Sequence, residues 1–406
     1  MIQTKNNWKK RTLLFLVSQC ITLFGSTLVQ MAIIWYVTIK TSSGAWIAAF
    51  SICSYLPQFL ISFIGGVWAD RYNRKKLIIF ADTLIAIVTL ITFAFLPFLS
   101  TEPMVLSILL LMSIIRSLGA GIQTPAVNAV IPQLVPEEYL MQYNGINATM
   151  QSIVQFAAPA AAGVILSVLS LRFTLLVDVT TAALGIGLFT CVMMPKQEII
   201  KEKSSIFADI KAGLAYSFSD RIIGKLLVVY GMFVLLCVPA GFMAGLLVSR
   251  VYGDTYWYLT AVELVGFAGM TIGGLLMGAW GGFNSRIKTL VLGLFSFGVM
   301  AIGMGIIRNF ILYLIMMALY GIALTMIQTA TTTLIQERAI EAMQGRVFGL
   351  MGAMYSGCLP MGMAIFGPMA DIISLEWIMV ASGLALIIIG IAVRLNKTMY
   401  GKECEG

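Results

Sequence analysis

Long apolar runs alternate with short polar intervals along the whole chain. Each run holds about 20 residues with few charges, the length of an α-helix that crosses a bilayer. Backbone polar groups inside a membrane must be paired within their own segment, so helices are the expected element. The pattern predicts an all-α membrane protein with twelve spans, at residues 12–39, 45–68, 77–99, 104–124, 143–168, 173–194, 226–248, 257–281, 289–307, 311–334, 347–370 and 377–395.

The longest polar interval separates the first six apolar runs from the last six. We therefore predict an N-terminal six-helix bundle at 1–195, a cytoplasmic linker at 196–225, and a C-terminal bundle with a short cytoplasmic tail at 226–406. Apolar residues recur in this linker at helical spacing, which predicts an amphipathic helix on the inner membrane surface. They are Ile206, Ile210, Leu214 and Phe218. A helix that only joins the two halves is the alternative.

A charged loop between the second and third runs reads Gly66-Val-Trp-Ala-Asp-Arg-Tyr-Asn-Arg-Lys-Lys76. A similar segment lies 212 positions later and reads Gly278-Ala-Trp-Gly-Gly-Phe-Asn-Ser-Arg-Ile-Lys288. The two share Gly, Trp, Arg and the last Lys. A duplicated six-helix unit explains the match, and such internal repeats are typical of transporters with a binding site near the membrane centre.

Composition excludes a soluble globular domain. Hydrophobic residues make up 59% of the chain and charged residues only 11%, where about 25% charged is usual. Most of the 26 Lys and Arg residues fall on one side of the membrane when both termini are cytoplasmic, as the positive-inside rule requires. We expect a multi-pass protein of the inner (plasma) membrane, and the scattered basic residues do not indicate a nucleic-acid partner.

The chain lacks several residues on which catalysis commonly depends. It has no histidine, its six cysteines form no Cys-x-x-Cys pair, and no Gly-x-x-x-x-Gly-Lys-Ser/Thr loop is present. The sequence therefore indicates no metal, no cofactor and no enzyme activity, and it does not predict structural disulfides.

Several motifs carry a family resemblance. The spacing Gly66-x-x-x-Asp70-Arg71-x-x-Arg74-Lys75-Lys76 resembles the signature loop of the major facilitator superfamily, and Arg116-Ser-Leu-Gly-Ala-Gly121 is similar to its mid-span arginine motif. From residue 6 to about 395 the chain resembles the macrolide efflux proteins and related drug:proton antiporters. The matching segments are Asn6-Asn-Trp-Lys9, Gln30-Met-Ala-Ile-Ile-Trp-Tyr36, Thr124-Pro-Ala-Val-Asn-Ala-Val-Ile-Pro-Gln-Leu-Val-Pro-Glu-Glu138, Gln336-Glu-Arg338 and Gly345-Arg-Val-Phe-Gly349.

The resemblance implies a proton-coupled exporter of amphiphilic drugs, macrolides among them, that works by alternating access. It further implies a monomer and admits an ATP-binding-cassette-type partner protein. One motif departs from the pattern: the antiporter motif of the fifth span is reduced to Ala158-Pro-Ala-Ala-Ala-Gly163. Two alternatives stay open, namely transport of an endogenous metabolite such as a siderophore or lipid, and a non-transporting membrane sensor or assembly protein.

Three charged residues are expected inside the membrane. Arg116 lies near the centre of the fourth span, where an unpaired guanidinium is costly, so it should face the protein interior and have a polar partner. Asp178 and Glu263 are the candidate proton carriers, since a buried carboxyl exchanges protons more readily near neutral pH. We expect Arg116 to take part in proton coupling, which the family resemblance associates with this motif. The alternative for Arg116 is a fixed ion pair between helices, and for Asp178 a pair with Arg172.

Polar residues form a stripe on one face of the first span and another on the fifth. A row of amides and hydroxyls is disfavoured against lipid, so both stripes should face a substrate cavity or bond to neighbouring helices. The predicted cavity residues are Gln19, Thr22, Ser26, Gln30, Asn144, Asn147, Gln151 and Gln155.

The charged loop also predicts a cytoplasmic gate. Asp70 can cap a neighbouring helix, and Arg71 and Arg74 can reach acidic residues on the next inner loop. The second copy has Gly282 in place of the acid, so the gate should be asymmetric. The predicted gate residues are Gly66, Asp70, Arg71, Arg74, Asp82, Glu137 and Glu138, with Asp82 as a partner of the basic loop. Asp371 is expected to be a solvated helix end.

Overall fold

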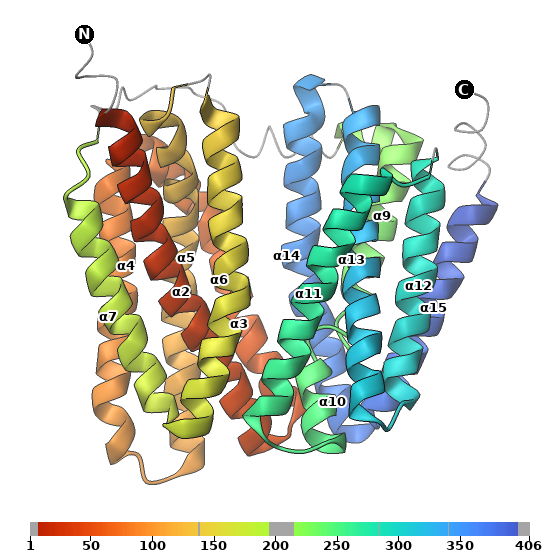
Figure 1. The fold of residues 1–406 in the computed structure, drawn as a ribbon, viewed down its shortest axis with the longest axis horizontal. Coiled ribbons are helices and arrows are strands. Elements are labelled where there is room, and N and C mark those ends of the chain that lie inside the picture. Colours follow the sequence, from red (N-terminus) through yellow and green to blue (C-terminus); the bar gives the residue numbers. More distant parts are fainter. Residues whose placement is uncertain (1–6, 137–138, 195–214, 284, 340, 397–406) are drawn as a thin grey trace. The chain divides into compact units, whose positions relative to one another are not determined.

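The structure is a computed structural model of the 406-residue chain, and it describes all residues except 1–6, 137–138, 195–214, 284, 340 and 397–406. The described elements are helices (Figure 1). In chain order they are α2 (Asn7–Thr41), α3 (Gly44–Arg71), α4 (Arg74–Phe95), η1 (Leu96–Phe98), α5 (Glu102–Leu134), α6 (Leu140–Val168), α7 (Leu171–Thr190), α9 (Arg221–Leu236), α10 (Ala244–Val251), α11 (Tyr256–Trp280), α12 (Arg286–Ile306), α13 (Phe310–Arg338), α14 (Glu341–Ile372) and α15 (Leu375–Leu395).

The chain divides into two compact units. Unit 1 comprises Met1–Lys40, Ala49–Lys201 and Thr255–Thr260, and unit 2 comprises Thr41–Ala48, Glu202–Asp254 and Ala261–Gly406. Each unit is a bundle whose long helices lie side by side (Figure 1). The first turn of α3 thus belongs to unit 2, while the rest of that helix belongs to unit 1.

Eleven of the described helices are long and apolar enough to cross a membrane. The predicted seventh span, at 226–248, differs from the expectation because it is interrupted. It consists of α9 and the short α10, with a non-helical turn between Cys237 and Met243. Pro239 in this turn has no backbone N–H to donate. An interrupted backbone at membrane depth is tolerated where protein surrounds it, and Cys237, Val238, Ala240 and Met243 are indeed buried.

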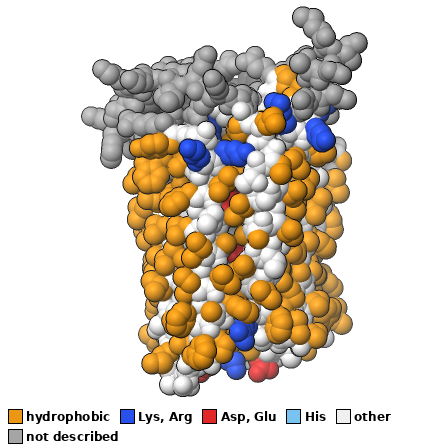
Figure 2. Space-filling model, turned by 90° about the vertical axis from the view of Figure 1, so that its left-hand side faces the viewer, with side chains coloured by type: hydrophobic (Ala, Val, Ile, Leu, Met, Phe, Trp, Pro, Cys, Tyr) orange, Lys and Arg blue, Asp and Glu red, His pale blue; other side chains and the backbone are white. Residues whose placement is uncertain are grey.

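The outer surface of unit 1 is that of a membrane protein. Large apolar side chains are exposed along its helices, among them Leu60 on α3, Leu111 on α5 and Leu184 on α7. Figure 2 shows such side chains covering the lateral face, with Lys and Arg confined to its two edges. This belt fits lipid contact, since it would be costly to expose to water.

The internal repeat predicted from the loop sequences is present at the level of individual hydrogen bonds. Asn73 caps α4 by accepting from the backbone N–H of Lys76, and Ser285 caps α12 by accepting from that of Lys288. The two caps stand 212 positions apart, as the aligned loops require. Both are short polar side chains that favour helix N-termini.

The repeated arginine behaves in the same way in both copies. Arg74 donates from Nε to the carbonyl of Ala69, at 2.9 Å, and Arg286 donates from Nη1 to the carbonyl of Gly281, at 2.8 Å. Each arginine thereby bonds the end of the helix before the loop. The arginine shared by the two loops therefore stabilises the same local structure in both copies.

Candidate functional site: a buried charge pair beside a polar cavity

Arg116 on α5 forms an ion pair with Asp178 on α7 in the interior of unit 1. Asp178 is 2% exposed and Arg116 is 9% exposed. Thr89 on α4 lies between them, with its hydroxyl 2.5 Å from Arg116 Nη1 and 3.2 Å from Asp178 Oδ2. Arg116 Nη2 donates to the hydroxyl of Ser26 on α2 at 3.0 Å. Four helices thus supply the site.

The packing around the pair follows from small residues. Gly25 on α2 lies directly against Asp178 and Thr181, and a Cβ at that position would come within 3.1 Å of the Asp178 Cα. This close approach brings Ser26, the next residue, into reach of the guanidinium. Every charged atom named here has a hydrogen-bonding partner, which is the condition under which a buried ion pair is tolerated.

A small polar cavity of about 60 Å³ adjoins the pair within unit 1. Its lining combines hydroxyl and amide groups with a few apolar side chains, and Arg116 forms part of the wall. The lining residues are Ser26, Gln30, Ile33, Ile34, Phe50, Ser54, Gln58, Ser113, Arg116, Ser117 and Ala120. A polar cavity of this size is large enough for one or a few waters.

The structure thus brings together two of the three predicted intramembrane charges. Asp178 bonds to Arg116, whereas Arg172, the alternative partner, places its guanidinium 4.3 Å above the ring of Phe93. The sequence analysis treated Arg116 and Asp178 separately, because residues 62 positions apart on different helices give no signal of contact. It did not include Thr89, Gln58 or Ser117 among the site residues.

Glu263, the third charge, belongs to unit 2 and is partly buried in α11. It lies within electrostatic reach of the phenols of Tyr313 and Tyr320 on α13. The hydroxyl of Tyr313 is fully buried and has no hydrogen-bond partner among the described residues. Tyr320 lies against Gly241, in the turn that interrupts α9 and α10, so Glu263 sits among aromatic side chains near this turn.

The predicted polar stripes have different environments. On α2, Ser26 and Gln30 line the cavity, while Gln19 and Thr22 are buried and bond within their own helix. The stripe on α6 does not line that cavity: Asn147 is partly buried and Gln151 and Gln155 are exposed, and the side chain of Asn144 lies outside the described residues.

The predicted gate is only partly within the described residues. Glu137 and Glu138 lie outside them, as do the side chains of Asp70 and Arg71. Arg74 reaches the carbonyl of Ala129 on α5, at 2.7 Å, besides that of Ala69.

Asp82 has a bonded partner on another helix. It is buried on α4 and accepts a hydrogen bond from Gln123 on α5 at 2.8 Å. In the second copy of the charged loop, Arg286 forms an ion pair with Glu337 at the end of α13, at 3.1 Å. Burial on the inward face of α4, which the sequence does not reveal, determines the partner of Asp82.

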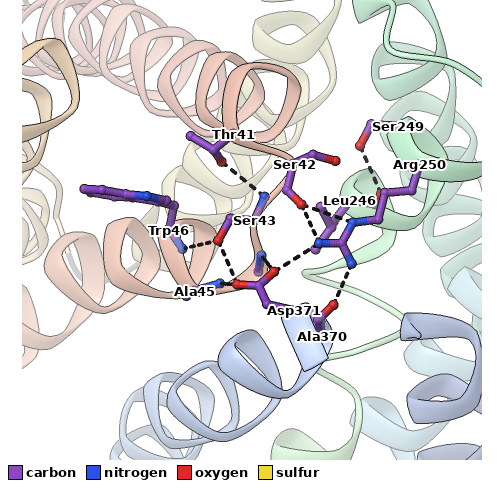
Figure 3. Close-up of polar contacts among 11 residues, drawn as sticks. Thr41, Ser42, Ser43, Ala45, Trp46, Leu246, Ser249, Arg250, Ala370 and Asp371 are labelled. Carbon is purple, nitrogen blue, oxygen red and sulfur yellow. Dashed lines mark hydrogen bonds and ion pairs between the residues drawn. The ribbon is translucent and has the colours of Figure 1, made fainter. Parts of the chain in front are cut away.

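Asp371 is exposed near the end of α14, as expected for a solvated helix end, but it also has several bonded partners. It lies at the end of α14, where its carboxylate accepts from the Ser43 hydroxyl and from the backbone N–H groups of Gly44 and Ala45, at 2.6–2.9 Å (Figure 3). Arg250 on α10 bonds the same carboxylate at 3.0 Å. We call this group of contacts the Asp371 clasp.

The clasp holds the start of α3 within unit 2. Arg250 also donates to the carbonyls of Ser42 and of Ala370, so three chain segments meet at one guanidinium (Figure 3). Gly44 and Gly367 lie in direct contact beneath it, with no side chain between the backbones. The negative charge at the first turn of α3 also suits the positive end of the helix dipole.

The described residues hold no cluster of possible metal ligands: they contain no group of three or more His, Cys, Asp or Glu side chains that could hold a metal ion. Helical bundles with an apolar outer belt and an internal charge pair define an integral membrane protein.

Comparison with known proteins agrees with this class. Residues 15–363 match the Major Facilitator Superfamily, and the chain belongs to that family. It is 29% identical to macrolide efflux protein A of Streptococcus pyogenes over 95% of this chain and 96% of that protein. It is 22% identical to the staphyloferrin A transporter of Staphylococcus aureus over 88% of this chain and 89% of that protein.

Solved structures show the same fold. The nucleoside transporter NupG, as its D323A mutant, superimposes with a TM-score of 0.72 over 97% of this chain and 100% of that chain, at 14% identity. This chain is thus a multi-pass membrane transporter of the major facilitator fold.

Proposed function

We propose that this protein exports amphiphilic drugs, macrolide-type antibiotics among them, in exchange for protons. The observation that carries the proton part is the Arg116–Asp178 pair, buried among four helices and open to a polar cavity. The substrate part is supported by the similarity to macrolide efflux protein A over nearly the whole of both chains.

In the proposed cycle, Asp178 carries the proton. A proton arriving through the cavity neutralises its carboxylate, so the attraction to Arg116 falls and the guanidinium relies on the hydroxyls of Ser26 and Thr89. The helices that carry these groups, α2, α4, α5 and α7, then favour a different packing. Loss of the proton on the other side of the membrane restores the pair, as alternating access requires.

Unit 2 supplies a second candidate carrier in Glu263. Its carboxylate has the phenols of Tyr313 and Tyr320 nearby, which could donate to it in either state. In unit 1, the polar faces of α2 and α6 offer polar groups that an amphiphilic substrate needs. We propose that the substrate binds to these polar helix faces near the membrane centre, where transporters built from internal repeats bind their substrates.

Drug accumulation in a pump-deficient bacterial host tests the proposal. Cells that express the wild-type chain should accumulate less macrolide than cells with the empty vector, and a protonophore should abolish the difference. Asp178→Asn should lose this active export while it retains passive exchange of substrate, because an amide cannot carry the proton. Equal membrane abundance of both proteins is the control.

A panel of other amphiphiles decides the substrate class. Unchanged accumulation for every macrolide and every other amphiphile would overturn drug export. Active export that survives both the protonophore and Asp178→Asn would overturn the proton part and leave the substrate part standing.

A siderophore is the second candidate substrate. The similarity to the staphyloferrin A transporter, and 26% identity to the enterobactin exporter EntS of Shigella boydii over 83% of this chain, favour it. Growth under iron limitation distinguishes siderophore transport from drug export. It is measured once with siderophore added to the medium and once with siderophore made by the host. A drug exporter should change growth in neither condition.

The proposal also covers the oligomeric state of the protein, its orientation in the membrane and its inner gate. We propose that the chain acts as a monomer in the plasma membrane, with both termini and the loop at 66–76 in the cytoplasm, and that Arg74 with its neighbours forms the inner gate. The bundles at 1–195 and 226–406 would move against each other about the site. A partner protein of the ATP-binding-cassette type stays an option that the family resemblance admits.

A further inference from the structure

The helix α3 contains a proline at its centre. Pro57 has no N–H for the carbonyl of Cys53, and its ring crowds that carbonyl, so the helix is weakened at this turn. The next donor, the backbone N–H of Gln58, would in a regular helix bond the carbonyl of Ser54. The start of α3 is tied into unit 2 by the Asp371 clasp, so this turn lies between two differently anchored parts.

A hydroxyl from α5 bridges this weak turn. Ser117 accepts from the Gln58 N–H at 2.8 Å and donates to the Ser54 carbonyl at 2.7 Å. It therefore connects the donor and the acceptor that an uninterrupted helix would pair directly. Ser117 is 4% exposed, and it lines the small polar cavity together with Ser54 and Gln58. A side chain inserted into a helix ladder is a recognised cause of local bending.

The part of α3 after the proline is packed tightly on α5. Gly121, one turn after Ser117, lies against Gln58 and Ile61, and a Cβ there would come within 2.7 Å of the Gln58 carbonyl oxygen. Gly65 in turn lies against the backbone of Gly121. This segment of α3 must follow any movement of α5, because no flexible side chain separates the two backbones.

Ser117 also adjoins the charge pair in sequence. Arg116 and Ser117 are consecutive on α5, so they point to different sides of the helix: Arg116 towards Asp178 on α7, and Ser117 towards α3. Because Gln58 follows α5, a shift or rotation of α5 that accompanies loss of the ion pair would act on the other bond of Ser117, to the Ser54 carbonyl before the proline.

We propose that Ser117 is a positioning residue that couples the Arg116–Asp178 pair to a hinge in α3 at Pro57. The coupling to transport rests on the proposed proton exchange; the bridge itself does not. When the pair is intact, the hydroxyl holds the turn closed; when Asp178 is neutralised, the bridge loosens and α3 bends there.

Hydrogen exchange of the full-length protein in lipid nanodiscs tests the bridge. Ser117→Ala should speed exchange in α3 peptides that contain Gln58 by roughly fivefold to tenfold, the factor expected for one lost hydrogen bond. Ser382→Ala is the matched control, because Ser382 is also buried but bonds only within its own helix, α15. Ser117→Thr keeps a hydroxyl and should retain most of the protection.

The coupling is tested by a double-mutant cycle. Asp178→Asn mimics the neutral carboxyl and should speed exchange around Gln58 when Ser117 is present, but add nothing further when it is replaced by Ala. Pro57→Ala restores the missing N–H. In the Pro57→Ala protein, Ser117→Ala should therefore have a smaller effect on exchange. The double variant Pro57→Ala/Ser117→Ala can also be measured if Ser117→Ala alone fails to fold.

Two results would overturn the proposal. Equal exchange in the Ser117→Ala and Ser382→Ala proteins would mean that the hydroxyl does not hold the turn. An undiminished response to Asp178→Asn without Ser117 would mean that the pair acts on α3 by another route. Neither result depends on drug transport, which is measured separately, so failure of the proposed function is recognised by itself.

Discussion

At the scale of single residues, the central feature is the different chemistry of the two members of the charge pair. A guanidinium keeps its charge at any physiological pH, whereas a carboxylate is neutralised when it takes up a proton. Both are surrounded by helices, with Thr89 and Ser26 as their remaining partners. A carboxyl group and a guanidinium that are each left buried without the partner should therefore affect the stability of the protein differently as the pH changes.

This difference predicts opposite pH behaviour for two variants. Arg116→Leu and Asp178→Asn should each lower the free energy of unfolding, by roughly 3–5 kcal/mol as for other broken buried pairs. Acidic pH should restore part of the loss in Arg116→Leu, because the unpaired Asp178 then binds a proton. It should restore nothing in Asp178→Asn, where the unpaired Arg116 stays charged.

Thermal unfolding of the purified proteins in detergent, followed at acidic and neutral pH, measures the effect. Arg172→Leu is the control, since this exposed arginine contacts the Phe93 ring and not the pair. The same pH dependence in both variants would contradict the assigned roles.

At the scale of helices, glycines set the distances between the packed elements. In unit 2, Gly269 and Gly273 on α11 face α13, where Gly321 lies against the backbone of Gly266 and Met270. Close approach through small residues is the usual way in which membrane helices associate, because lipid offers no hydrophobic driving force. The neighbouring Gly274 faces away, with nothing within 4 Å of the position of a Cβ.

The adjacent glycines allow a matched comparison. Gly273→Ala should destabilise the protein by about 1–3 kcal/mol, since the new Cβ would lie 2.9 Å from the Ile322 Cα, and overpacking costs about this much. Gly274→Ala should be neutral, or stabilising by up to about 1 kcal/mol, from helix propensity alone. Thermal unfolding in detergent distinguishes them, and equal effects would mean that α11 and α13 are further apart.

At the scale of the whole molecule, two related bundles share one element. The caps at Asn73 and Ser285 and the arginines at 74 and 286 make the duplication visible in structure. The first turn of α3 belongs to unit 2 and its remainder to unit 1, with the Asp371 clasp at one anchor and α5 at the other. The hinge proposed at Pro57 lies between these anchors.

The orientation of the chain yields a further prediction. A single cysteine introduced in a cysteine-free background at Tyr72, in the basic loop, should react with a membrane-impermeant maleimide only in permeabilised cells. One at Phe98, in the connection between α4 and α5, should react in intact cells, because the two positions lie at opposite ends of α4. Both side chains are exposed, at 59% and 80%. Reversed labelling would place the termini outside.

Much of the fold could be predicted from the sequence. The lengths of the apolar runs predicted the spans, and the aligned loops predicted the repeat, because both depend on local composition. The seventh span was predicted as one helix since its hydropathy is continuous. Its interruption between Cys237 and Met243 depends on Pro239 together with the packing of Tyr320 on Gly241, which hydropathy does not register.

The sequence by itself determined that this chain is a helical membrane protein with two related halves, and that Arg116, Asp178 and Glu263 lie where charge is costly. Only the tertiary structure decided that Arg116 pairs with Asp178, that Asp82 bonds Gln123, and that Ser117 bridges Gln58 and Ser54 beside Pro57 in α3. The physical reason is that burial cost depends on composition and position along one segment. The choice of partner depends on how residues from distant segments meet.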